Sequence, residues 1–186
     1  AEYLSLETNL TDRFAVSLSG RHENYTDFGS TTSGALSGRF DLTDTFALRG
    51  SASTGFRAPS VGQQHYSTTT STFRGIGNSL GLPEGIYNNS LVPVDNPVAR
   101  LLGAEPLKAE TSRNYSVGMV WSPTSNVNLT VDAYQIKVDN RIALSGSLGT
   151  TTPTVRDYLA ANGISNINYS SINYFTNALD TETRGI

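Results

Sequence analysis

The segments Leu10-Thr11-Asp12-Arg13-Phe14-Ala15 and Leu42-Thr43-Asp44-Thr45-Phe46-Ala47 repeat one phrase, L-T-D-x-F-A, at two places in the chain. A short polar stretch between two apolar runs is typical of a tight turn between strands. The runs on either side are roughly ten residues long, which is the length of a β-strand that crosses a bilayer at a tilt. The repeated phrase therefore predicts hairpins in the wall of a membrane β-barrel.

The runs beside these turns alternate strictly between apolar and polar residues. In residues 13–24, for example, Phe14, Val16 and Leu18 share one parity, while Ser17 and Ser19 share the other. Residues 34–42, 45–57 and 113–121 repeat this pattern of period two, which is typical of a strand with one apolar face.

Two folds fit this alternation: a soluble β-sandwich, and a barrel with lipid outside and a polar lumen. Three observations favour the barrel. The strands are longer than the five or six residues usual in soluble sheets. Arg21, Arg39 and Arg49 fall on the polar parity, which suits a hydrated interior. Aromatic residues cluster near the predicted strand ends, as in the interfacial girdles of membrane proteins. They are Phe14, Phe46 and Trp121 beside the turns and Tyr25 and Phe56 at the opposite ends.

The lengths of the connections also alternate. Short turns are predicted at 10–13, 42–45 and 122–126, a moderate connection at 25–33, and long connections at about 57–111 and 139–171. Short periplasmic turns opposite long extracellular loops are the arrangement of outer-membrane barrels. Within the second long loop, Thr152, Pro153 and Gly163 fit the N-cap, N1 and C′ positions of a short helix. We therefore predict an all-β, antiparallel transmembrane barrel segment of about seven long strands with one short helix in a loop.

Residues 126–138 break the alternation, because Val127, Leu129 and Val131 share one parity and Tyr134 and Ile136 share the other. Either a β-bulge near 132–134 or large side chains that face a plugged lumen would explain the change. Residues 172–186 are similarly ambiguous.

Composition narrows the functional classes. The net charge is −3 and the chain has no basic block, which argues against a nucleic-acid partner. The chain contains no cysteine, which rules out disulfides and thiolate zinc sites, and its acidic residues have no metal-loop spacing. We therefore expect no cofactor and no metal. No signal peptide opens the chain, so we expect a mature chain or a fragment.

Several motifs follow one another in a recognisable order. Thr54-Gly55-Phe56-Arg57-Ala58-Pro59-Ser60 ends a strand, and Pro106-Leu107-Lys108-Ala109-Glu110-Thr111-Ser112-Arg113-Asn114-Tyr115 leads into the next. The ordered set, with the later segments 129–136, 139–142, 175–178 and 183–186, resembles the β-barrel of TonB-dependent receptors of the Gram-negative outer membrane. The positions that carry the family motifs are Gly55, Phe56, Arg57, Pro59, Glu110, Ser112, Asn114 and Arg141.

The resemblance implies that residues 1–186 are part of one barrel domain of 22 strands around a plug. The plug, its TonB-contacting box and the C-terminal strands are expected to lie outside this sequence. The family's activity would be active import of a scarce ligand, most often an iron-siderophore, with energy from the TonB complex. The resemblance also implies four kinds of partner: the outer-membrane lipid, the plug and remaining strands of the same protein, the TonB complex, and a small-molecule ligand such as a ferric siderophore.

Candidate ligand-binding residues lie in the first long loop, where aromatic, amide and basic side chains are mixed. They are Gln63, Gln64, His65, Tyr66, Phe73 and Arg74. An ordinary solvated loop is the alternative reading of this segment. A passive porin or a structural or adhesive surface barrel is the alternative function. An enzyme ranks third, because His22 and Asp27 form a single pair without a second acidic dyad, and we expect no catalytic residue.

Overall fold

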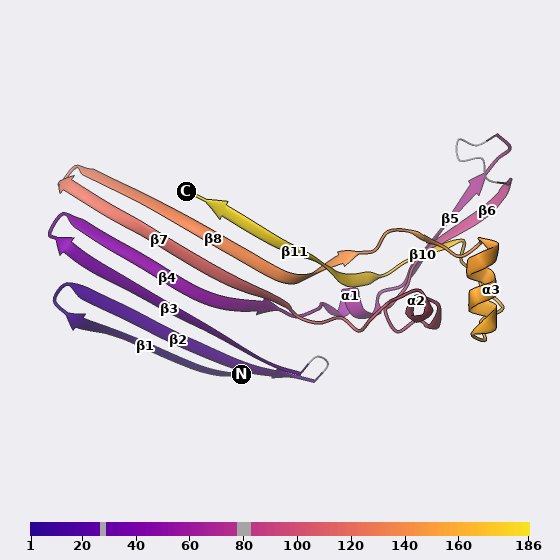
Figure 1. Ribbon diagram of the computed structural model, residues 1–186, viewed down its shortest axis with the longest axis horizontal. Coiled ribbons are helices and arrows are strands. Elements are labelled where there is room, and N and C mark those ends of the chain that lie inside the picture. Colours follow the sequence, from indigo (N-terminus) through magenta and orange to yellow (C-terminus); the bar gives the residue numbers. More distant parts are fainter. Residues whose placement is uncertain (27–28, 78–82) are drawn as a thin grey trace. The chain divides into compact units, whose positions relative to one another are not determined.

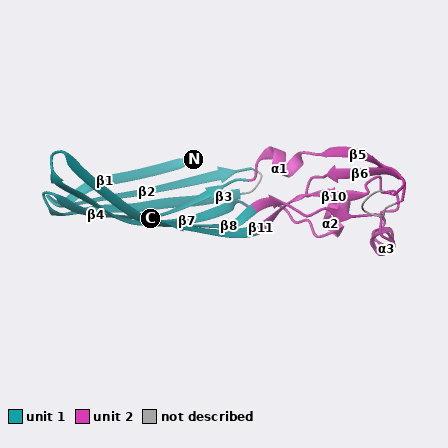
Figure 2. Ribbon diagram, turned by 90° about the horizontal axis from the view of Figure 1, so that it is seen from above, with its two compact units in different colours: residues 1–58, 109–141, 179–186 teal, residues 59–108, 142–178 magenta. Residues whose placement is uncertain are grey.

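The computed structural model describes residues 1–26, 29–77 and 83–186. The chain forms two compact units (Figure 2). The strand unit comprises residues 1–58, 109–141 and 179–186, and the loop unit comprises residues 59–108 and 142–178. Each unit therefore combines segments that are distant in the sequence.

The strand unit is a single sheet of long strands in the order β1-β2-β3-β4-β7-β8-β11 (Figure 1). Its elements are β1 Glu2–Thr11, β2 Phe14–Tyr25, β3 Gly29–Thr43, β4 Phe46–Arg57, β7 Glu110–Thr124, β8 Val127–Leu144 and β11 Phe175–Gly185. Every pairing from β1 to β8 is antiparallel. The 7-stranded sheet confirms the sequence-based fold, and β8 and β11 run on into the loop unit.

The strand register places apolar residues opposite apolar residues, and polar residues opposite polar residues, on neighbouring strands. Leu18, Leu36, Ala52 and Tyr115 form one paired row, and Ser17, Ser37, Ser51 and Ser116 form an adjacent row on the opposite face. We call these sides the apolar face and the polar face. Leu18, Leu36 and Tyr115 are each half exposed on the apolar face, as expected for side chains that contact lipid.

The turns show how far the strands are tilted. The strand register allows the three turns to be compared on the numbering of β4 and its extension. The first turn, at 12–13, lies level with positions 46–47, and the third turn, at 125–126, lies level with positions 41–42. The second turn is at positions 44–45 itself. Each turn is thus displaced by two to three residues relative to the preceding one, or roughly one residue per strand. With a rise of about 3.4 Å per residue and about 4.8 Å between strands, this stagger corresponds to a tilt of roughly 35–40°. Transmembrane barrels have strand tilts in this range.

Aromatic side chains lie near both ends of the strands, as predicted. Phe14 and Phe40 meet edge to face near the turns, with ring centroids 6.1 Å apart. Near the other ends Tyr25 and Phe56 meet in the same way at 6.0 Å. On β4 the interval from Phe46 to Phe56, at the tilt above, spans about 27 Å, close to the roughly 25 Å height of the apolar band of an outer-membrane barrel.

One sequence-based expectation was wrong, and the structure excludes one of the two explanations for the parity change in residues 126–138. The moderate connection expected at 25–33 is mostly strand, because β2 runs to Tyr25 and β3 begins at Gly29. A bulge near 132–134 is excluded, because the β7–β8 register is uninterrupted from Asp139 to Leu129. The register irregularity of this hairpin lies beside its turn, between Trp121 and Thr124.

Tyr134 therefore lies on the polar face, in the row of Ser116. The structure shows why a large ring fits there: a Cβ atom at Gly185 would lie 2.6 Å from atoms of the Tyr134 ring. The ring occupies the space that a side chain on β11 would need. This arrangement explains why the apolar parity changes along β8 without a bulge.

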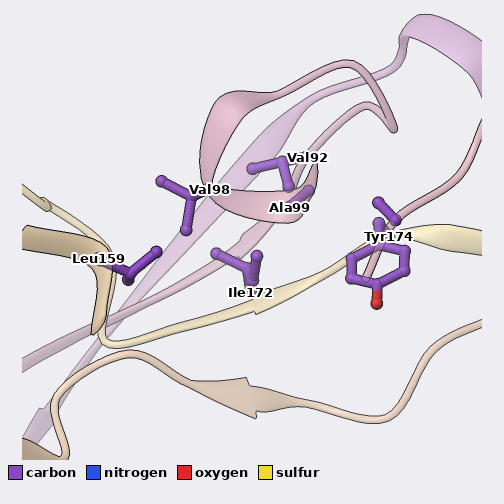
Figure 3. Close-up of a cluster of buried hydrophobic side chains, with 7 residues drawn as sticks. Val92, Val98, Ala99, Leu159, Ile172 and Tyr174 are labelled. Carbon is purple, nitrogen blue, oxygen red and sulfur yellow. The ribbon is translucent and has the colours of Figure 1, made fainter. Parts of the chain in front are cut away.

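The described residues of the loop unit form a small sheet, in the order β5-β6-β10-β9, and three helices. Its elements are α1 Val61–His65, β5 Thr68–Arg74, β6 Gly85–Leu91, α2 Pro97–Leu101, β9 Leu148–Gly149, α3 Pro153–Ala161 and β10 Ser171–Asn173. The buried residues of its core are Val92, Val98, Ala99, Ala104, Leu159, Ile172 and Tyr174 (Figure 3). None of the helices in the described part of the chain is long and apolar enough to cross a membrane.

Helix α3 forms where the second loop was predicted to be helical. Pro153 is at the first helical turn, and Gly163, with φ of 86°, ends the helix at the position where a left-handed backbone favours glycine. Thr152 is the N-cap residue, but its side chain makes no capping hydrogen bond. The three predicted positions of the helix ends are therefore confirmed.

Candidate functional site

The motif residues Arg57 and Glu110 form a bidentate ion pair at the ends of β4 and β7. The strand register sets them opposite each other. The Arg57 Nε donates to Glu110 Oε2 at 3.1 Å, and the Nη2 donates to Oε1 at 2.6 Å. The Glu110 side chain is only 8% exposed, whereas that of Arg57 is 62% exposed. The pair joins the two ends of the first long loop, which explains why both motifs belong to one pattern.

Other motif residues pack around the same strand ends. A Cβ atom at Gly55 would lie 2.9 Å from the Ser112 Oγ, so a larger residue there would require the Ser112 hydroxyl to move. The Asn114 amide donates to Ser53 Oγ at 3.3 Å, which extends the polar contacts along the same face. Arg141 donates from Nη1 to Thr181 Oγ1 at 3.4 Å and thereby contacts β11. These contacts hold neighbouring strands in register.

The next motif residues start helix α1 in the loop unit. Ser60 is its N-cap and accepts from the Gln63 amide at 3.2 Å, while the Gln63 side chain accepts from the Ser60 amide at 3.0 Å. This reciprocal pair is a capping box. The Gln64 side chain donates to the carbonyl of buried Pro59 at 3.2 Å. Both candidate glutamines therefore have a local role in fixing the start of the helix.

The remaining candidate ligand residues present more of their surface. His65 and Tyr66, at the end of α1, are exposed, and Phe73 on β5 is 65% exposed. The Arg74 guanidinium stacks over the Tyr87 ring at 5.6 Å, a cation–π contact between β5 and β6. Their role in binding a ligand stays a prediction.

One feature of the polar face was not singled out from the sequence. Arg49 on β4 and Asp132 on β8 form a bidentate pair across the intervening strand, with Nε donating to Oδ1 at 2.8 Å. They meet above Gly118 of β7, where a Cβ atom would lie 2.0 Å from the carboxylate oxygen. Only a glycine in the middle strand allows this contact. The sequence signal for this contact is a glycine on the polar parity of β7, but its meaning is clear only when the register of β4, β7 and β8 is known.

Two questions remain for the described residues: whether they form a metal site, and whether they support the His22–Asp27 pair considered for an enzyme. They contain no group of three or more His, Asp or Glu side chains that could hold a metal ion. His22 Nδ1 lies 2.8 Å from Thr32 Oγ1, a contact between neighbouring strands. Asp27, its proposed partner in an enzyme, lies outside the described residues.

Known proteins share this architecture. A family model described as TonB dependent receptor-like, beta-barrel, matches residues 1–186. The chain belongs to this family of TonB-dependent receptor barrels. No curated protein matches the sequence.

Solved structures of siderophore receptors carry the same fold. The siderophore receptor PirA from Pseudomonas aeruginosa matches with a TM-score of 0.67 and 20% identity, over 98% of this chain and 29% of that one. PirA from Acinetobacter baumannii matches at 0.65 and 19%, over 98% and 24%. A mutant of the ferric enterobactin receptor PfeA from Pseudomonas aeruginosa, in complex with enterobactin, matches at 0.66 and 19%, over 98% and 23%. This TonB-dependent receptor chain thus spans about a quarter of the length of the receptors it matches.

Proposed function

We propose that this barrel segment belongs to an outer-membrane receptor of a Gram-negative bacterium that imports a scarce small molecule, with a ferric siderophore as the first candidate. The observation that carries the proposal is the family match along the whole chain, on a tilted strand wall with two long folded loops. In this assignment the short turns are periplasmic and the long loops are extracellular. Long loops on a rigid scaffold are common places for binding residues.

Cationic side chains of the loop unit are candidate contacts for an anionic ligand, although equal numbers of basic and acidic side chains leave the described part of this unit without net charge. The 7 ion pairs found among the described residues all lie on strands of the strand unit. Arg74, Arg100, Lys108 and Arg156 of the loop unit form none of the ion pairs found among the described residues. They are therefore available to a chelate with negative charge, alongside His65 and Tyr66.

The polar face and the sheet edges suggest the partners within the whole receptor. Arginine-carboxylate pairs and serine rows on this face suit a hydrated lumen that holds a plug domain of the same protein. In the sheet of the strand unit, β1 and β11 are the outermost strands. We propose that they pair with further strands of the same barrel, because an open edge in lipid leaves backbone groups without hydrogen bonds. Energy would come from the TonB complex, acting through the plug.

Uptake by cells tests this proposal. Cells with and without the full-length receptor would be given radioiron bound to ferric enterobactin or other siderophores, with and without a working TonB complex. We expect receptor-dependent accumulation that needs the TonB complex. Accumulation that is equal with and without the TonB complex would show a passive porin. No accumulation of any chelate, with normal surface expression, would favour a structural or adhesive barrel.

A further inference from the structure

The core of the loop unit is assembled from two loops that are far apart in the sequence. Val92, Val98, Ala99 and Ala104 come from the loop between β4 and β7, and Leu159, Ile172 and Tyr174 come from the loop between β8 and β11. Figure 3 shows Leu159 and Ile172 pointing toward Val98 and Val92. Ala99, Leu159 and Ile172 are fully buried, so the most protected side chains of each loop lie against the other loop.

Backbone hydrogen bonds join the same two loops. β6 and β10 pair in parallel, with Ser171 opposite Asn89. On either side of this pairing, the Val92 amide donates to the Asn173 carbonyl at 2.9 Å and the Ser170 amide donates to the Asn88 carbonyl at 2.8 Å.

Side chains add to this connection. The Ser171 hydroxyl donates to Asn89 Oδ1 at 2.6 Å, and the side-chain amide of Asn88 donates to the backbone carbonyl of Asn168 at 3.0 Å. The Tyr174 hydroxyl donates to the Leu102 carbonyl at 2.9 Å, beside the turn at Gly103. The contact between the loops is therefore both apolar and hydrogen-bonded.

Neither loop has the means to hold this structure alone. The helices α2 and α3 have 5 and 9 residues, shorter than helices that are stable in isolation. β10 has only 3 residues, and an isolated hairpin such as β5–β6 is marginal in water. Each loop loses its hydrophobic partner if the other one unfolds.

We infer that the two long loops form one cooperative folding unit and open or close together. The inference goes beyond the proposed function, because it holds whatever ligand the receptor binds. It means that a movement of either loop that admits a ligand carries both, since separation would expose the shared core to water.

Hydrogen exchange on the full-length receptor in lipid nanodiscs tests the inference without any ligand. Leu159→Ala removes a fully buried side chain from the second loop. We expect faster exchange by about 30-fold or more, since such substitutions cost at least about 2 kcal/mol and 1.4 kcal/mol is tenfold. The acceleration should be equal at the Ile164 amide, in the second loop, and at the Ala104 amide, in the first. Both amides bond within their own loop, so only cooperative unfolding links them.

Two further variants complete the test. Tyr158→Ala, on the exposed side of the same helix, is the matched control and should leave exchange in the first loop unchanged. Ile172→Val is a milder change, which should accelerate exchange in both loops by a smaller, equal factor of about 2- to 10-fold. Acceleration confined to residues 142–178 in Leu159→Ala and Ile172→Val would overturn the inference.

Discussion

The ion pair between Arg57 and Glu110 should be energetically coupled, although one partner is mostly exposed. Arg57→Met keeps the aliphatic stem of the side chain and removes both charged hydrogen bonds to Glu110. Exposed pairs are worth at most about 1 kcal/mol, whereas breaking a fully buried pair costs about 3–5 kcal/mol. Because Glu110 is 8% exposed and Arg57 is 62% exposed, we expect a coupling free energy of about 1–2 kcal/mol, between these limits.

A double-mutant cycle measures this coupling directly. The free energy of unfolding of the full-length receptor in lipid vesicles would be obtained in urea for wild type, Arg57→Met, Glu110→Gln and the double variant. Arg39 and Asp41 provide the matched control, since they pair within one strand with both side chains substantially exposed. Their cycle, with Arg39→Met and Asp41→Asn, should give about 0.5 kcal/mol or less. If the two cycles give the same coupling, burial of Glu110 does not strengthen the pair and the reasoning fails.

Three further predictions concern single contacts. Gly118→Ala should destabilise the barrel by about 2 kcal/mol or more in urea unfolding, because the added methyl group overlaps the Asp132 carboxylate; an unchanged free energy would contradict the three-strand contact. Burial raises the pKa of the Tyr174 hydroxyl, so folding favours its protonated form. The resulting contribution to the stability of the loop unit is fully present below about pH 10 and is lost as the pH rises through the pKa of the folded state. Hydrogen exchange in the loop unit should therefore accelerate above about pH 10 relative to Tyr174→Phe, after correction for the intrinsic rate, and parallel pH profiles would refute this. A disulfide between Asn89→Cys and Ser171→Cys, whose side-chain oxygens are 2.6 Å apart, should form readily and leave ligand uptake within about twofold; uptake that only a reductant restores would show that the loops separate.

Much of the strand unit could be predicted because its physics is local. A strand with lipid on one side and a polar lumen on the other must alternate with period two, and each position reports its own environment. Three features each depend on only a few consecutive residues: the repeated Thr-Asp turns, the aromatic strand ends at Phe46 and Phe56, and the helix between Pro153 and Gly163. The structure confirmed each of these features.

The sequence left alternatives open where a residue's surroundings depend on a distant strand. The parity of Tyr134 conflicts with that of Leu129, and from the sequence either a bulge or a side chain that faces the lumen explained this. Only the structure shows that Gly185 on another strand provides the space for the Tyr134 ring on the polar face. Asp132 likewise reaches Arg49 only because Gly118 lies between them. No pattern within one strand contains this information.

The sequence alone thus determined the family, the two-faced strands and the positions of the turns, because these follow from local alternation and ordered motifs. Only the tertiary structure showed that the motif residues Arg57 and Glu110 close the first loop and that Ser60, Gln63 and Gln64 stabilise a helix start. It also showed that two separate loops share the core around Leu159 and Ile172. The physical reason is that burial and pairing between distant segments depend on the register of the whole sheet and the packing of both loops, which no single segment encodes.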